Sequence, residues 1–461
     1  MKKYAAPTED MSFILTNLLD IDNYLKSINN KELSFDSLKM IIEEAGKFAC
    51  DELDTINQVG DQEGIKLENG VVRMPESFIK AYKKFVNTGW FSIIGEKKYG
   101  GQDLPLSAVV MINEIWHSTN MSFATNNMLT QGAVELLESH GNEKQKEYYL
   151  PNLISGKWSG TMNLTEPHAG SDLSSIKTKA IEKDKKFLIK GTKIYITHGD
   201  QDMSDNIIHL VLAKLPNAPE GVRGISLFLV PKYFLNDKGT KVKNDIKVVS
   251  VEHKLGHNAS PTCVLSFGEN EGAIGELVGE PNQGLKAMFT MMNNARLNVG
   301  VQGLAISERA YQKALSFSKE RIQGYSLNKN ITGPVEIIKH PDVKRMLMEM
   351  KSQTEAMRGL AITTGNFIDK YKNFPNSPEG KECLFISNLL TPIVKAWCTE
   401  QSIYITSLGV QVHGGMGFIE DTGAAQYYRD CRILAIYEGT NGIQALDLLR
   451  RKLFQKNGET Y

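Results

Sequence analysis

Glu438 is the residue of this 461-residue chain whose surroundings best suit acid–base chemistry. It follows the apolar pair Ile436-Tyr437 and precedes Gly439-Thr440, at a glycine-rich helix start. Burial in a partly dry pocket would raise the pKa of this carboxyl group above its usual value of about 4.3, which would make it a usable base near neutral pH. The alternative interpretation is a capping or surface carboxylate at a helix junction.

A glycine-rich turn lies upstream of Glu438. Gly414, Gly415 and Gly417 interrupt a helical pattern just after Gln411. Glycines this close together indicate a tight turn or a close approach of the backbone to a ligand.

A third segment with chemical potential is the string Met162-Asn163-Leu164-Thr165-Glu166-Pro167-His168-Ala169-Gly170-Ser171-Asp172. Its threonine and serine hydroxyls, together with a glycine that allows close approach, can offer hydrogen bonds to a flat polar ring system and to phosphates. A β-turn rich in capping residues would explain the last three residues alone, but not the whole string.

The composition is that of a soluble globular protein, with 23% charged and 41% hydrophobic residues. Lys plus Arg and Asp plus Glu both number 53, so the net charge argues against a nucleic-acid-binding protein. The five cysteines show no metal-ligand spacing, so we expect reduced thiols, no metal site and a cytoplasmic location. No apolar run reaches eighteen residues and the amino terminus lacks one altogether, so we expect neither a membrane span nor a secretory signal.

Hydrophobic periodicity divides the chain into three parts. Helical spacing predominates up to about Gly156, short β-branched runs follow, and helical spacing returns from Pro281. We therefore expect an α+β protein with an N-terminal helical domain (residues 1–158), a central small antiparallel β domain (159–281) and a C-terminal four-helix-bundle domain (282–461).

The expected elements follow from the same patterns. Helices are expected over residues 106–119, 123–139, 143–155, 284–323, 341–362, 382–410 and 443–453; strands are expected over 187–189, 194–197, 207–213, 225–230, 246–251 and 263–267; and a loop is expected over 61–72.

The order of these parts, the loop at 162–172 and the strings Gln-Val-His-Gly-Gly (411–415) and Tyr-Glu-Gly-Thr (437–440) together resemble the acyl-CoA dehydrogenase family. The resemblance covers nearly the whole chain from about residue 40. The additional amino-terminal helices and the form Tyr-Glu-Gly-Thr-Asn-Gly are most similar to the branch that contains 3-methylmercaptopropionyl-CoA dehydrogenase. Members of that branch carry a further C-terminal helical domain, which we expect to be absent from this chain.

The resemblance implies a role for each matched residue. Glu438 would take the α-proton of the substrate. Contacts with FAD are implied for Met162, Leu164, Thr165, Gly170, Ser171, Tyr195, Thr197, Arg321, Gln323, Gln411, Gly414, Gly415, Thr440 and Asn441, and contacts with the substrate for Ser171, Asn293, Arg296 and Gly439. Tyr195 stands where the family has a tryptophan, and stacking on the flavin should survive because a phenol also presents a π face.

The resemblance also implies the reaction and the partners. The chain would desaturate an acyl-CoA thioester between Cα and Cβ, as in fatty acid β-oxidation, and pass electrons to electron-transfer flavoprotein. Arg321 and the 411–415 turn would lie on opposite sides of a flavin site shared between subunits, so we expect a homodimer or homotetramer. The alternatives are an acyl-CoA oxidase and a non-catalytic or DNA-binding flavoprotein of the same fold.

Overall fold

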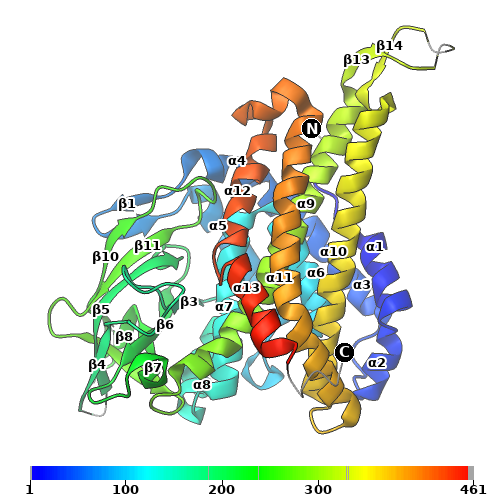
Figure 1. Cartoon of the computed structure of the whole chain (residues 1–461). Helices are drawn as coiled ribbons and strands as arrows, with labels where there is room; N and C mark the ends of the chain where they lie inside the picture. The colour runs from blue at the N-terminus through cyan, green and yellow to red at the C-terminus, as the bar shows by residue number, and fades with distance from the viewer. Residues whose placement is uncertain (1–2, 185, 237, 329, 331, 455–461) are drawn as a thin grey trace.

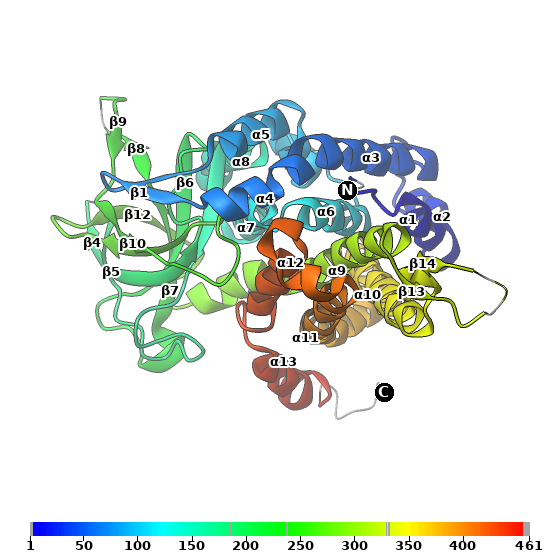
Figure 2. The ribbon, with the colours of Figure 1, turned by 90° about the horizontal axis from the view of Figure 1, so that it is seen from above.

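The computed structural model describes residues 3–184, 186–236, 238–328, 330 and 332–454. Helices form a broad layer beside a β-sheet layer, and the two layers lie side by side when seen from above (Figures 1 and 2). The first part of the chain is helical, as expected, and comprises α1 (Thr8–Phe13), α2 (Ile21–Ser27), α3 (Phe35–Phe48), α4 (Asp54–Glu63), α5 (Glu76–Asn87), α6 (Leu106–Thr119), α7 (Met121–His140) and α8 (Glu143–Ile154).

The predicted loop over 61–72 is wrong. α4 extends to Glu63, and a hairpin of β1 (Lys66–Glu68) and β2 (Val71–Arg73) follows. Asn69 and Gly70 at its tip both have positive φ, 51° and 73°. An Asn-Gly pair in this conformation is the favoured two-residue hairpin turn, so the signal was present in the sequence.

The central sheet runs in the order β10-β11-β5-β12-β7-β6-β3, with β4 paired beside β5. Its strands are β3 (Trp158–Asn163), β4 (Lys179–Lys183), β5 (Lys186–Thr197), β6 (Asn206–Lys214), β7 (Ile225–Pro231), β10 (Ile246–Val251), β11 (Thr262–Phe267) and β12 (Ala273–Val278). The prediction of an antiparallel domain is wrong for β3 and β6, which pair in parallel over six residues. A second hairpin joins β8 (Tyr233–Leu235) to β9 (Lys241–Lys243).

Three long helices form the C-terminal part, as expected: α9 (Gly284–Glu320), α10 (Pro341–Asn373) and α11 (Pro378–His413). The short helices α12 (Ala424–Cys431) and α13 (Asn441–Asp447) follow, and the hairpin of β13 (Ile322–Tyr325) and β14 (Pro334–Glu336) projects from the end of α9 (Figure 1). α6 packs against both α9 and α10, and the expected C-terminal four-helix bundle stays a prediction. The domain limits at 158/159 and 281/282 stay a prediction.

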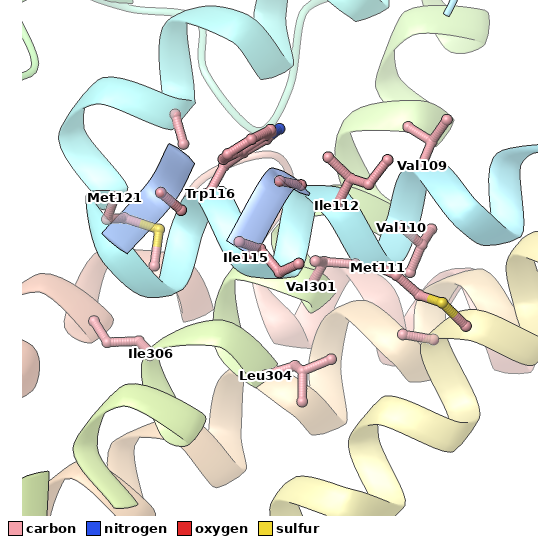
Figure 3. Close-up of a cluster of buried hydrophobic side chains, with 14 of the residues drawn as sticks. Val109, Val110, Met111, Ile112, Ile115, Trp116, Met121, Val301, Leu304 and Ile306 are labelled. Atoms are coloured by element: carbon pink, nitrogen blue, oxygen red, sulfur yellow. The ribbon is translucent and has the colours of Figure 1, made fainter. Parts of the chain in front are cut away.

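A buried hydrophobic cluster joins α6 to α9. Figure 3 shows Ile115 of α6 and Val301 of α9 pointing toward each other, whereas Trp116 points away from α9. Ile115 is fully buried, and an isoleucine side chain contributes about 1.5–3 kcal/mol when fully buried. This packing fixes the position of α9, whose first turns border the site described below. None of the described helices combines the length and apolar content that a membrane crossing requires.

Candidate active site

A cavity of about 1040 Å³ lies where the sheet meets the helices. Its wall combines the loop after β3, the end of β5, the first turns of α9 and the segment from Arg432 to Arg451. Eleven of the residues predicted from the sequence to bind cofactor or substrate, or to act in catalysis, line it together: Met162, Leu164, Thr165, Gly170, Ser171, Tyr195, Thr197, Arg296, Glu438, Gly439 and Thr440.

The loop after β3 is anchored by a buried ion pair. Glu166 accepts hydrogen bonds from Lys193 Nζ at 2.9 Å and from Thr178 Oγ1 at 2.6 Å. Lys193 is fully buried in β5 and also donates to the carbonyl of Leu164 at 2.9 Å. Burial alone would raise the pKa of Glu166, but Lys193 and these hydrogen bonds hold it below its ordinary value. The anchor fixes the backbone that carries Thr165 along the cavity.

Tyr195 occupies a bulge at the end of β5. β11 pairs Cys263 with Ile196 and Leu265 with Lys193, so β5 holds one extra residue in this interval. Tyr195 has φ +59°, an unusual conformation for a large aromatic residue, and its side chain is 62% exposed on the cavity. The bulge thereby directs a flat aromatic face at the cavity.

Glu438 sits in a strained turn before α13. It has φ +55°, followed by Gly439 with φ +87°. A Cβ at Gly439 would come within 2.7 Å of Gln444 Nε2, which donates to the Gly439 carbonyl at 3.1 Å. Thr440 caps α13 by accepting a hydrogen bond from Ile443 N at 3.3 Å. A residue forced into left-handed backbone geometry costs on the order of 1–3 kcal/mol and is typical of functional sites.

The electrostatic surroundings of Glu438 suit a base. Burial raises the pKa of its carboxyl group, Lys395 and Arg296 lower it, and the outcome is about 7. Among the described residues, no hydrogen bond or ion pair reaches this carboxylate. A carboxyl group with a pKa near the working pH and a free lone pair is well placed to accept a proton from a ligand in the cavity.

Two charged residues near Glu438 were missed by the sequence analysis. Asp447 accepts from Arg296 Nη1 at 3.3 Å and from Arg451 Nε at 2.5 Å, and the Phe289 ring lies below both guanidinium groups at 6.0 and 5.5 Å. Lys395 lies on α11 and is fully buried. A lysine or aspartate inside an apolar stretch is a usable sequence signal, because such residues are rarely buried without a partner.

Five predicted cofactor residues lie away from the cavity, at the far end of the helices: Arg321, Gln323, Gln411, Gly414 and Gly415. Phe317, one turn before Arg321, stacks on His413 with ring centroids 4.5 Å apart. Arg321 and the 411–415 turn therefore share one end of the bundle, and their expected places on opposite sides of a flavin site shared between subunits stay a prediction. At 1.5 Å per residue, Arg321 lies roughly 37 Å along α9 from Arg296.

The remaining two predicted residues also lie outside the cavity wall. Asn441 makes hydrogen bonds inside the protein, accepting from Lys395 Nζ at 3.0 Å and donating to Glu400 Oε2 at 3.0 Å. Asn293 is exposed on α9. A cofactor role for Asn441 and a substrate role for Asn293 stay predictions.

Comparison with known proteins places these features in a family. The family described as acyl-CoA dehydrogenase matches in three parts: its N-terminal domain at residues 36–157, its middle domain at 161–269 and its C-terminal domain at 282–453. The chain is 47% identical to 3-methylmercaptopropionyl-CoA dehydrogenase of Ruegeria pomeroyi, over 99% of this chain and 77% of that protein. It is 36% identical to a butyryl-CoA dehydrogenase of Syntrophomonas wolfei, with the same coverage. The structure of butyryl-CoA dehydrogenase from Megasphaera elsdenii superposes with a TM-score of 0.70 at 25% identity, covering 90% of this chain and 98% of that one.

Proposed function

Because this chain belongs to the acyl-CoA dehydrogenase family and is an FAD-dependent oxidoreductase acting on acyl-CoA, we propose that Glu438 is the base with which it desaturates the thioester. The observation that carries this proposal is the position of Glu438. It is a carboxylate in a strained turn, on the wall of a large cavity, with a pKa of about 7 and no internal hydrogen-bond partner among the described residues.

The cavity wall fits FAD. Thr165, Ser171 and Thr197 line one side with hydroxyl groups that suit the polar edge of a flavin, and Tyr195 offers a face for stacking. The volume of about 1040 Å³ is at the upper end of the usual range for ligand pockets, which leaves room for a substrate beside the cofactor. When bound, FAD supplies the electron acceptor that protein side chains lack, receiving the β-hydrogen as hydride at N5.

The residues of this chain have two tasks in the reaction. Above pH 7 the Glu438 carboxylate is ionised and accepts the proton from the substrate Cα. The backbone N–H of Glu438 donates to no backbone acceptor among the described residues, so it is available to stabilise the thioester oxygen as negative charge develops there. Both groups belong to one residue, and its strained conformation orients them together.

A second copy of the chain supports the cofactor in this proposal. Arg321 directly follows α9, and segments at this end of the bundle carry exposed aromatic side chains: Tyr325 of β13 at 74% and Phe418, which follows the 411–415 turn, at 84% exposure. Exposed aromatic residues around a guanidinium group suit an interface that also binds a phosphate. We infer a homodimer or homotetramer in which this end of one subunit contacts the dinucleotide of another, and electron-transfer flavoprotein as the electron acceptor.

The experiment is anaerobic flavin reduction with a panel of acyl-CoA substrates from short to long chains. The purified protein should be yellow, and at least one acyl-CoA should bleach the flavin at a rate that rises with pH through about 7, because a protonated carboxyl group cannot accept the α-proton. Oxygen consumption during turnover would instead indicate an acyl-CoA oxidase. A protein that binds no FAD would contradict the proposal.

A further inference from the structure

We propose that Lys395 is a positioning residue that keeps Glu438 ionised and ready to accept a proton, an inference that rests on the proposed role of Glu438 as the base. Lys395 does not line the cavity, so it would act through Glu438 and not on the substrate. Its place in the fold, its hydrogen bonds and the local balance of charge support this role.

The crossing of α9 and α11 fixes where Lys395 lies. A Cβ at Gly300 would come within 2.4 Å of Val394, and one at Gly303 within 2.6 Å of the Cys398 carbonyl, so the two helices touch at backbone level. Lys395 follows Val394 directly, and Arg296 lies one turn before Gly300. The close crossing therefore places one cation from each helix near the turn that carries Glu438.

The helix that follows Glu438 holds the ammonium group. Asn441, the first residue of α13, accepts hydrogen bonds from Lys395 Nζ at 3.0 Å and from Thr399 Oγ1 at 3.2 Å. The Asn441 amide in turn donates to the Ala396 carbonyl at 3.2 Å. Asn441 is thus fixed on both sides and ties Lys395 to the segment that begins three residues earlier with Glu438.

The charge of Lys395 is not cancelled by an ion pair. Arg296, the other cation near Glu438, is paired with Asp447. Among the described residues, no carboxylate lies within ion-pair distance of Lys395, and its direct acceptor is a neutral amide. A buried cation with this arrangement favours ionisation of the Glu438 carboxyl group, which is why its pKa stays near 7 despite burial.

The groups that influence this pair come from three elements. Lys395 of α11 and Arg296 of α9 lower the pKa of Glu438. The pKa of Lys395 is raised by Glu438 and by the exposed Glu400, and lowered by Arg296. Burial lowers the pKa of Lys395 to about 8, so it remains charged over the range in which Glu438 loses its proton. Asp430, elsewhere in the chain, also has a pKa of about 7 and must be separated from Glu438 experimentally.

The test compares Lys395→Met with Lys395→Arg in the full-length, FAD-loaded protein, using the pH dependence of anaerobic flavin reduction. In Lys395→Met the midpoint of the pH profile of flavin reduction should rise by about 1–3 pH units. An opposite charge near a carboxyl group lowers its pKa by about that amount, and the substitution removes this charge. The limiting rate at high pH should stay near the native value. Lys395→Arg keeps the positive charge and should therefore show the native midpoint. A Lys395→Met protein that is slower at every pH but has an unchanged midpoint would overturn the proposal.

A measurement that does not depend on turnover tests the role of Lys395 separately from the proposed function. The infrared band of the protonated Glu438 carboxyl group can be followed through a pH titration and assigned by its loss in Glu438→Gln, with Asp430→Asn identifying the second group. Its midpoint should rise in Lys395→Met, and also in Asn441→Ala if Lys395→Met fails to fold. An unchanged infrared midpoint in both variants would refute the role of Lys395. Failure of every acyl-CoA to reduce the flavin of the native protein would instead refute the proposed function.

Discussion

Two clusters of charged residues lie beside α9, and their carboxylates differ in how they are hydrogen-bonded. In the first, Arg358 of α10 donates to both oxygens of Glu114 at 2.7–3.1 Å and to Glu308 Oε2 at 2.6 Å. Arg358 is 1% exposed and Glu114 is fully buried. In the second, Glu438 has two cations near it but accepts no hydrogen bond among the described residues.

The contrast separates a structural role from a chemical one. A carboxylate whose oxygens are all bonded is held in one state, and its proton affinity is of no use to a ligand. A carboxylate left open on a cavity wall, with its charge supported from a distance, can accept a proton without breaking an existing hydrogen bond. The same residue types therefore form a fixed ion-pair network at one place and the proposed base at the other.

The largest expected effect is the loss of the base. Glu438→Gln keeps the volume of the side chain but removes its ability to take the α-proton, so flavin reduction should fall by about 10²–10⁴-fold. Stopped-flow reduction with the best acyl-CoA would measure this, with FAD content and acyl-CoA binding checked by absorbance. Flavin reduction at close to the native rate would show that the base lies elsewhere.

The second effect is on stability. Arg358→Met leaves Glu114 and Glu308 buried without their cation, which should lower the free energy of unfolding by about 3–5 kcal/mol. Urea unfolding would show a lower midpoint, while flavin reduction per bound FAD should stay native. Replacing all three residues, with Glu114→Leu and Glu308→Leu added, should recover much of the stability. A triple variant as unstable as Arg358→Met would show that the cluster contributes more than charge neutralisation.

The third effect is a small shift of the pH profile of flavin reduction, in the direction opposite to the shift expected for Lys395→Met. Asp447→Asn removes the anion that pairs with Arg296, so more positive charge acts on Glu438 and the pKa of Glu438 should fall. The midpoint of the pH profile should move below 7 by less than about one unit, which corresponds to under about 1.4 kcal/mol. Asp447→Glu is the matched control and should keep the native profile. An upward shift in Asp447→Asn would contradict this account of the charges.

Local signals in the sequence were sufficient to predict much of the fold. The helix over 106–119 was predicted to the residue, because Pro105 marks its start and an unbroken helical pattern follows. The parallel pairing of β3 with β6 was not predicted, since pairing between distant segments leaves no local pattern. The bulge at Tyr195 depends on how β5 and β11 align, which is equally invisible in either strand alone.

The candidate site was likewise predicted only where a local string of residues carries the signal. Glu438 and the loop after β3 were found because each lies in a compact, recognisable string. Lys395 was missed because its position near Glu438 depends on the crossing of α9 and α11, which Gly300 and Gly303 permit. Arg321 was found by motif, but its position at the far end of α9 emerged only when the helices were assembled.

The smallest expected effect concerns Glu420, which the sequence indicated as a solvated turn residue. The structure adds an ion pair, because Arg429 donates to Glu420 at 2.8 Å, yet the Glu420 side chain is 60% exposed. Exposed pairs contribute about 0–1 kcal/mol, and Arg429 remains bonded to Asp61 at 3.1 Å when Glu420 is removed. Glu420→Gln should therefore change stability by less than about 1 kcal/mol and leave flavin reduction native. Asp61→Asn is the matched comparison: Asp61 is 10% exposed and anchors the same guanidinium group, which borders the cavity, so its loss should have the larger effect on both quantities. If Glu420→Gln slowed flavin reduction as much as Asp61→Asn, the exposure of a carboxylate bonded to Arg429 would not decide its effect at the edge of the cavity.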